Sequence, residues 1–506
     1  MPAERLTAVH NGDVFSLADA GESSVDIFRK EVLQAVADGG RIAVLFTRSL
    51  GESRFDLTAV IAHEAESTLE ILSAQVEREY ASLTPECSQA HWFEREIFEQ
   101  HGLRPVGHPW LKPLRFPHNK RAAAARNEAA KQPVACGTAD FFQMTGEEVH
   151  EVAVGPVHAG IIEPGHFRFQ CHGETVYHLE ISLGYQHRGV ERAMIGGPNL
   201  RSLHYMETLA GDTSIGHAVA YCRAVEALAR THVPPRAQVI RGIALELERI
   251  ANHIGDLGAL AGDVGYLPTM SYCGRIRGDV LNATALLCGN RFGRNLIRPG
   301  GVAFDLDREM AEEMKCRLGR VANDAKSAVE LLWESPSVTA RFDQTGVLTS
   351  EVCNRIGLVG VAARACGVAR DVRQDFPSGI FRFAQIPVST WHTGDVFARA
   401  FVRWLEIQRS LAFVEEQLDS LPEGAIREPV GPLQPEASVV TLVEGWRGEI
   451  CHVATTDSQG LWANYKVVDP SFHNWFGLSL ALRNQQISDF PLCNKSFNLS
   501  YCGHDL

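Results

Sequence analysis

Histidines, acids and glycines are concentrated between Gly155 and Asp263 of this 506-residue chain. Imidazole is the side chain that moves protons or binds metals near neutral pH. Nine of the 20 histidines fall in this window: His158, His166, His172, His178, His187, His204, His217, His232 and His253. Any single histidine is more often a satisfied structural residue, but the cluster as a whole predicts a functional site.

The overall composition describes an ordinary globular protein that is acidic. Hydrophobic residues make up 45% of the chain and charged residues 22%, as is usual for such proteins. The chain carries 48 basic and 61 acidic residues, a formal net charge of -13, whereas a general nucleic-acid binder needs a basic face. Nucleic acid is therefore not expected as a partner, and the length predicts about two to four domains.

The 12 cysteines are scattered, and no two of them have the Cys-x-x-Cys spacing. That spacing is usual for zinc and iron–sulfur ligands within one chain, so no such site is expected. A chain of this length needs no disulfides, which favours a reducing, cytosolic setting. The N-terminus has no apolar run of the secretory type. No window reaches the roughly 18 apolar residues of a membrane helix, so any membrane attachment is expected through other subunits.

Residues 1–118 predict a small α/β unit. The patterns predict helices at 25–38 and 92–102, each ended by glycine, and strands at 41–47, 55–61 and 68–71. Four prolines between positions 105 and 117 predict an extended loop on the surface.

The stretch 119–135 is rich in alanine and polar residues and has little to bury, so it predicts a linker. We therefore expect a first domain at 1–120, a linker at 121–140 and a second domain at 141–506.

The second domain should be mainly α-helical with a small β-sheet. Alternating apolar and polar residues predict strands at 167–170 and 175–181, joined by a hairpin turn. The further elements expected are helices at 217–232, 236–260, within 304–333 (capped by Asp305 or Asp307) and at 394–419, and strands at 438–443 and 450–454. The expected fold class is thus multidomain, an α/β domain followed by a mainly α domain.

Two stretches resemble subunits of respiratory complex I and of its hydrogenase relatives. Glu94-Arg-Glu96, Gly102 and Gly107-His-Pro-Trp-Leu111 resemble the signature of the complex I 30-kDa subunit. The window 155–263 resembles the large subunit of membrane-bound nickel–iron hydrogenases and the related 49-kDa subunit of complex I. The fusion of the two resembles the large subunit of group 4 hydrogenases, of the formate hydrogenlyase and hydrogenase-4 type.

The resemblance also indicates which ligands are missing. In functional members two Cys-x-x-Cys pairs hold nickel and iron, because thiolates are soft ligands. The positions that resemble the first pair are Ala210 and Thr213, and those of the second lie near Ser500 and Gly503, with Cys502 between them. We therefore expect no standard nickel–iron centre, and no metal ligand is assigned.

The quinone-binding pattern of the complex I relatives is altered as well. The histidine loop is kept as Gly155-Pro-Val-His158 through Gly165-His166, and the resemblance implies that His158 and His166 bind a cofactor. The tyrosine that completes the family's pattern is replaced at about Gly211.

Glu191 is a catalytic candidate, because it resembles the carboxylate that gates protons in hydrogenases. A buried carboxylate can have its pKa raised toward neutral, which suits proton transfer. The alternative is a structural ion pair with Arg188 or Arg192.

Three further catalytic candidates adjoin the lost ligands. His217 follows the first pair and is either functional or a satisfied histidine that caps the helix. Asp212 lies between two lost ligands, where it could bind a hard cation, relay protons or pair with Arg447. Arg447 resembles the arginine that overhangs the hydrogenase metals, and a guanidinium can hold a carboxylate or an anion.

The C-terminal tail carries Cys493, Cys502 and His504, which could form a different metal site with His217 or Asp212. Their spacing matches no common ligand pattern. A tail that simply fills the old pocket is therefore the favoured interpretation.

Together with the resemblance, these residues predict a hydrogenase-like large subunit of a complex I-related oxidoreductase, peripheral on the cytoplasmic side of the membrane. It would couple electron transfer from an iron–sulfur small subunit to proton movement. Antiporter-like membrane-arm subunits would be further partners, and a quinone or another small molecule the electron acceptor. The alternatives are a non-catalytic scaffold subunit and, third, an active hydrogenase with unusual ligands.

Overall fold

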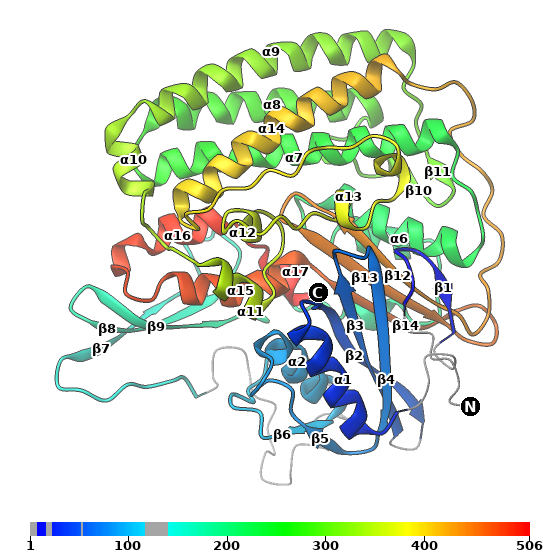
Figure 1. Cartoon of the computed structure of the whole chain (residues 1–506). Coiled ribbons are helices and arrows are strands. Elements are labelled where there is room, and N and C mark those ends of the chain that lie inside the picture. Colours follow the sequence, from blue (N-terminus) through cyan, green and yellow to red (C-terminus); the bar gives the residue numbers. More distant parts are fainter. Residues whose placement is uncertain (1–7, 17–22, 52–53, 117–139) are drawn as a thin grey trace.

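The computed structural model describes residues 8–16, 23–51, 54–116 and 140–506. Within these ranges the chain forms an N-terminal α/β unit and a larger unit that contains four long helices (Figure 1). The predicted linker at 121–140 lies, except for its last residue, outside the described residues. The domain boundaries therefore remain a prediction.

The N-terminal unit is built around an antiparallel sheet in the order β2–β3–β4. Its elements are α1 (Val25–Ala37), β2 (Arg41–Gly51), β3 (Arg54–His63), β4 (Thr68–Val76), β5 (Glu79–Ala81), η1 (Ser88–Ala90), α2 (His91–His101) and β6 (Arg104–Val106). Phe28, Val32 and Ala35 form the buried face of α1, at the spacing of one side of a helix. The helix α2 ends at Gly102, which has a φ of 75° that favours glycine. The predicted helices and strands of this unit are confirmed.

The proline-rich loop after α2 differs from the prediction, because its end is buried. The carboxylate of Glu99 accepts the backbone N–H groups of Leu114, Arg115 and Phe116, at 3.2, 2.8 and 2.7 Å. These three residues are at most 9% exposed. An acid on the preceding helix therefore holds the loop in the interior, which the prolines alone did not indicate.

The larger unit begins with the antiparallel sheet β7–β8–β9. Its strands are β7 (Val149–Val154), β8 (His166–His172) and β9 (Thr175–Ser182), and the predicted hairpin turn lies at residues 173–174. Three helices follow: α4 (Val190–Met194), α5 (Ser202–Glu207) and α6 (Ser214–Leu228).

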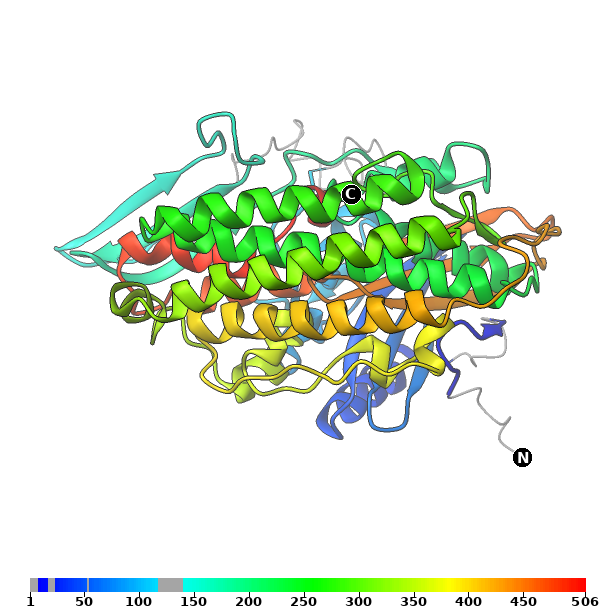
Figure 2. The same cartoon turned by 90° about the horizontal axis from the view of Figure 1, so that it is seen from above.

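Four long helices pack against one another and lie side by side along the molecule (Figure 2). They are α7 (Pro235–Asp263), α8 (Leu267–Cys288), α9 (Arg308–Trp333) and α14 (Val396–Asp419). Asp307 caps α9, as predicted. The sequence patterns missed α8, because Gly274 and Gly278 weaken its helical signal. None of the described helices is long and apolar enough to cross a bilayer.

Short elements connect and follow the long helices. They are β10 (Ile297–Arg298), β11 (Gly301–Val302), α10 (Pro336–Phe342), α11 (Ser350–Ile356), α12 (Gly360–Arg364), α13 (Val372–Asp375), η2 (Gly379–Arg382), α15 (Pro470–Ala481), η3 (Ile487–Asp489), α16 (Phe490–Phe497) and α17 (Tyr501–Asp505).

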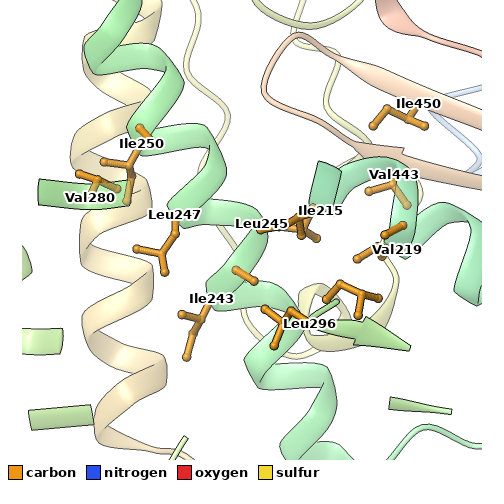
Figure 3. Close-up of a cluster of buried hydrophobic side chains, with 14 of the residues drawn as sticks. Ile215, Val219, Ile243, Leu245, Leu247, Ile250, Val280, Leu296, Val443 and Ile450 are labelled. Atoms are coloured by element: carbon orange, nitrogen blue, oxygen red, sulfur yellow. The ribbon is translucent and has the colours of Figure 1, made fainter. Parts of the chain in front are cut away.

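A second sheet of the larger unit contributes side chains to two hydrophobic cores, one on each face. Its strands are β12 (Ser438–Glu444), β13 (Glu449–Thr456) and β14 (Trp462–Val468), with β1 (Val14–Phe15) at the edge. Val443 and Ile450 face α6 and α7, and Figure 3 shows them near Val219 of α6. Val440 and Leu442 belong to a second core, which residues of both units share. Because successive strand residues point to opposite faces, β12 and β13 are buried along their whole length.

Buried ion pairs fasten the two units together. Arg41 of β2 is 1% exposed and lies 2.6 Å from Glu449 of β13 and 3.0 Å from Glu64. Arg370 of the larger unit shares Glu64 at 2.7 Å. The units therefore cannot separate without breaking buried charge pairs.

Replacing Arg41 by methionine should lower the free energy of unfolding by about 3–5 kcal/mol, because Glu449 would stay buried without its partner. Arg48→Met is the matched control, since Arg48 pairs with Asp56 inside the N-terminal unit and its side chain is 25% exposed. For this control we expect a loss of about 1 kcal/mol or less. Urea unfolding followed by circular dichroism measures both, and equal losses would contradict the role of Arg41 as a link between the units.

Candidate functional site

Two segments far apart in the sequence meet beside the N-terminus of α6: the turn 208–217 and the C-terminal stretch 498–506. Arg188 ties them together, because its guanidinium donates to the carbonyls of Leu209, at 2.8 Å, and Cys502, at 3.4 Å. The positions of the two lost ligand pairs therefore lie close together, in an interior region that we call the pocket.

Arg447 makes a second link between these segments. Its Nη1 and Nη2 lie 2.7 and 2.8 Å from the carboxylate oxygens of Asp212, and its Nε donates to the Asn498 carbonyl. The ring of Trp446 packs against the guanidinium, 3.9 Å from ring centre to Cζ, and donates through Nε1 to the Asp212 carbonyl. Of the roles considered for Asp212, the structure shows the pairing with Arg447.

This ion pair is charged on both sides. Burial raises the pKa of Asp212, but the Arg447 guanidinium outweighs it and lowers the pKa below the usual value. Burial likewise lowers the pKa of Arg447, and the Asp212 carboxylate more than reverses that. The pocket thus contains a fixed, bidentate guanidinium–carboxylate contact.

None of the lost ligand positions offers a thiolate. Ala210 is fully buried and has no donor atom. The hydroxyl of Thr213 donates to Asp212 and accepts from Trp446 Nε1, both at 3.1 Å. The hydroxyl of Ser500 accepts the backbone N–H of residue 503 at 2.9 Å and so caps α17.

Gly503 shows why the fourth position could not hold a cysteine in this fold. A Cβ atom at 503 would lie 2.7 Å from Oδ2 of Asp469, which is closer than real contacts allow. The carboxylate of Asp469 occupies the space that a side chain at 503 would need. These four positions therefore do not fit a nickel–iron centre, whose metals need thiolates.

Asp469 begins a buried chain of hydrogen bonds. Its Oδ2 lies 3.0 Å from Nε2 of His217, whose Nδ1 lies 3.1 Å from Nε2 of His452. Nδ1 of His452 lies 2.9 Å from the hydroxyl of Tyr465. All four side chains are at most 2% exposed. His217 is thus brought to the pocket as predicted, but it bonds along this chain instead of capping α6.

The protonation of the chain follows from its charges. Burial raises the pKa of Asp469, but His217 and Arg447 lower it further, so Asp469 is a carboxylate. Burial and the neighbouring His217 hold the pKa of His452 well below its usual value, and burial raises the pKa of Tyr465. Nε2 of His217 donates to the Asp469 carboxylate, and a neutral His452 can donate to His217 and accept from the Tyr465 hydroxyl.

Glu191 lies outside this pocket, and its predicted pKa shift is wrong. The carboxylate pairs with Lys466 at 2.8 Å and accepts the backbone N–H of Val467 at 3.0 Å. Burial raises the pKa of Glu191, but the Lys466 charge outweighs it and lowers the pKa. The predicted ion pair exists, with Lys466 in place of Arg188 or Arg192.

The two histidines of the loop 155–166 hydrogen-bond to backbone carbonyls of the same loop. Nε2 of His158 lies 2.9 Å from the Gly165 carbonyl. His166 uses both ring nitrogens, because Nε2 accepts from Arg168 Nε at 3.1 Å and Nδ1 donates to the Gly155 carbonyl at 3.2 Å. Cofactor binding by His158 and His166 stays a prediction, and in His166 both nitrogens are already engaged.

The loop reaches the pocket through Glu163, which hydrogen-bonds the Cys502 thiol. Burial and the Glu163 carboxylate raise the pKa of Cys502 to about 12. The remaining thiol of the pocket is therefore protonated, whereas a metal ligand would be a thiolate.

The other two candidates of the C-terminal tail, Cys493 and His504, have different neighbours. Cys493 lies against Gly346 and Arg399, and burial raises its pKa to about 11. His504 bonds to Asp505 at 2.9 Å. The structure does not bring Cys493, Cys502 and His504 together, and no cluster of three or more possible metal ligands occurs in the described part of the chain.

Glu248 of α7 forms the wall of the pocket behind the N-terminus of α6, and sequence patterns did not reveal it. Its carboxylate accepts the backbone N–H groups of Ile215 and Gly216, at 2.8 and 3.2 Å. Burial raises the pKa of Glu248 to about 8 in spite of these bonds, and the charge of Asp212 adds to the shift. Its role as a helix cap could be inferred only from the packing of α7 against α6.

Fold and pocket define a class of protein: a large-subunit scaffold of the hydrogenase type, fused to an N-terminal α/β unit, with hydrogen-bonding side chains in place of metal-binding thiolates. Family models agree with this class. Residues 29–129 match the respiratory-chain NADH dehydrogenase 30 Kd subunit, and residues 263–432 match the 49 Kd subunit. Both segments of the pocket lie outside these matches.

Similar proteins point to the same family. The carbon monoxide-induced hydrogenase of Rhodospirillum rubrum is 30% identical over 69% of this chain and 97% of its own length. Hydrogenase-4 component G of Escherichia coli is 30% identical, over 84% of this chain and 75% of its own length. NADH-quinone oxidoreductase subunit 4 of Thermus thermophilus is 31% identical, over 68% and 90%. The chain belongs to the family of hydrogenase and NADH dehydrogenase large subunits related to respiratory complex I.

Replacing Gly503 by alanine should lower the free energy of unfolding by about 1–3 kcal/mol, because the new Cβ would displace the Asp469 carboxylate. Gly278→Ala in α8 is the matched control, since a Cβ there meets no atom within 4 Å. The control should gain about 0.5–1 kcal/mol from the lower entropy of its unfolded chain. Urea unfolding measures both changes, and a neutral Gly503→Ala would show that Asp469 does not need this space.

Glu248→Gln should remove a pH dependence of stability. Between about pH 4.5 and pH 8 the folded protein holds a proton on Glu248 that the unfolded chain releases. Raising the pH in this window therefore lowers the free energy of unfolding of the native protein, by about 1.4 kcal/mol per pH unit from this group. The free energy of unfolding of the native protein minus that of the variant, measured by urea unfolding, should fall with this slope as the pH rises. It should level off above about pH 8. A difference that is independent of pH would mean that Glu248 is ionised in the fold.

Proposed function

We propose that this chain is the large subunit of a membrane-attached complex that couples electron transfer from an iron–sulfur partner subunit to proton movement, without a nickel–iron centre. The observation that carries the proposal is the buried chain Asp469–His217–His452–Tyr465 beside the Arg447–Asp212 pair. Four ionisable groups in unbroken hydrogen-bond contact are costly to bury unless every one is satisfied.

The arrival of an electron would supply the driving force for proton transfer to Asp469. An electron delivered next to the pocket, onto a quinone or another small molecule, adds negative charge close to Asp469 and Asp212. A like charge disfavours a carboxylate and raises its pKa. Asp469, held as an anion by His217 and Arg447 before this event, then becomes the proton acceptor of the pocket.

The chain delivers that proton by one shift across each hydrogen bond. Tyr465 gives its hydroxyl proton to Nδ1 of His452, Nε2 of His452 gives a proton to Nδ1 of His217, and Nε2 of His217 gives a proton to Asp469. Tyr465 then regains a proton from water. Each imidazole keeps one proton, and the net result is one proton moved from water to Asp469.

Exposed apolar side chains near the pocket fit the docking of a partner subunit. In the loop 155–166, Val157, Ile161 and Ile162 are 75%, 87% and 55% exposed. Apolar side chains gathered on a surface mark interaction sites. The names of the relatives describe components or subunits of larger assemblies. Attachment to the membrane would come through such partners.

Replacing Tyr465 by phenylalanine in the purified complex should lower turnover and coupled proton uptake at least tenfold, because the chain loses the group that passes a proton to His452. Asp469→Asn should act in the same direction. Tyr221→Phe is the matched control: its ring lies 6.2 Å from that of Tyr465, and its hydroxyl is outside the chain. Assembly of each variant is checked by size-exclusion chromatography.

Unchanged turnover and proton uptake in both Tyr465→Phe and Asp469→Asn would favour a non-catalytic scaffold. The observation on the side of that alternative is that both carboxylate oxygens of Asp212 already accept from the Arg447 guanidinium. Stoichiometric nickel in the purified native complex, measured by mass spectrometry, would instead support a hydrogenase with unusual ligands.

A further inference from the structure

A cavity of about 560 Å³ lies along the C-terminal half of α6, away from the pocket described above. Its walls come from α6, the start of α7, the end of β12, and the segments 11–13 and 378–382. At about 1.5 Å per residue, the 15 residues of α6 span roughly 20 Å between the Asp212 pocket and the far end of this cavity. Its volume lies within the roughly 300–1,000 Å³ typical of small-molecule sites.

The cavity has a strongly basic lining, although the whole chain is acidic. Two of its arginines are neutralised: Arg241 lies 2.5 Å from Glu226, and Arg373 lies 2.6 Å from Asp371. The arginines in its lining are Arg223, Arg230, Arg241, Arg373 and Arg382.

Three of these arginines have no carboxylate at ion-pair distance among the described residues: Arg223, Arg230 and Arg382. Arg223 donates only to neutral oxygens, the Leu442 carbonyl at 2.7 Å and the carbonyl and side chain of Asn11 at 3.3 Å. The other two also donate to neutral oxygen atoms. A guanidinium that donates only to neutral oxygens gains more binding free energy from an anion than one that already has a carboxylate partner.

The acids in the lining do not balance these charges. Glu226 is engaged by Arg241, and Glu444 lies 2.7 Å from Arg364. Asp13 accepts the backbone N–H of residue 10 at 2.9 Å on the exposed rim. The cavity therefore keeps an excess of positive charge.

Burial changes the pKa of Arg223, the innermost of the three arginines. It lowers the pKa of Arg223 to about 10; Glu226 partly opposes this, and the charges of Arg382 and Arg241 add to it. Arg223 remains charged at neutral pH, in an environment that disfavours the charge. An anion in the cavity would relieve that cost.

Apolar side chains form the rest of the wall: Val219, Leu245, Ile380, Phe381 and Val443. Figure 3 shows Val219 of α6, Leu245 of α7 and Val443 of β12 gathered in one cluster. An inorganic ion would leave this surface unused, whereas the body of an organic molecule would cover it.

We propose that this cavity binds a small organic anion, whose carboxylate or phosphate is held by Arg223 and Arg382 and whose apolar body lies against Val219, Leu245 and Phe381. The planar guanidinium fork fits both acid groups. The site is separate from the proposed proton-transfer pocket, and neither proposal depends on the other.

Calorimetric titration of the purified full-length protein tests the site with four probes: octanoate, octyl phosphate, octan-1-ol and inorganic phosphate. Octanoate or octyl phosphate should bind saturably and at least tenfold more tightly than octan-1-ol and inorganic phosphate. The stronger of the two anions identifies the acid group. Arg382→Gln should weaken that binding at least fivefold, whereas Arg320→Gln, which removes the same charge from the exposed face of α9, should leave it unchanged.

Arg223→Lys keeps the buried charge but loses the fork, and it should also weaken binding at least fivefold. Arg382 is exposed, so its variant keeps the test valid if the change at Arg223 impairs folding. Equal binding of octanoate and octan-1-ol would show an apolar crevice without anion recognition and overturn the proposal. So would native affinity in the Arg382→Gln variant.

Discussion

The bidentate contact between Arg447 and Asp212 is the interaction on which the pocket depends. With the bond from Arg447 to the Asn498 carbonyl, it links the turn before α6 to the C-terminal segment, and Arg188 makes a parallel link. These are the two segments on which the resemblance to nickel–iron hydrogenases predicts thiolate ligands. Here arginines join them, and a buried guanidinium requires a carboxylate, because an unpaired charge of either sign would be strongly destabilising.

In the absence of thiolates, the residues around these positions depend on one another for space and for hydrogen bonds. Gly503 leaves the space that the Asp469 carboxylate fills. Asp469 accepts from His217, and His217 is in turn paired with His452. Each polar atom is satisfied by the next, as a buried network requires. The result is a buried set of hydrogen-bonding groups at the positions where the resemblance predicts thiolate ligands.

The sheet β12–β13–β14 determines where these groups lie. One face packs on α6 and the other on the N-terminal unit, so His452 and Tyr465 point toward α6 while Lys466 points toward α2. This arrangement also explains the error for Glu191. Its partner is a lysine 275 residues away in sequence, and a nearby opposite charge decides whether a buried carboxylate has a raised or a lowered pKa.

Residue patterns alone predict the helices with clear periodicity and caps, such as α9 after Asp307 and α2 before Gly102, and they show that the expected ligand positions carry no cysteine. These are local properties, set by spacing and residue type. That His217, His452 and Asp469 form one chain follows from the fold alone, since His217 lies more than 230 residues in sequence from both of the others. Charge partners and burial depend on which elements pack together, and a single sequence does not specify that packing residue by residue.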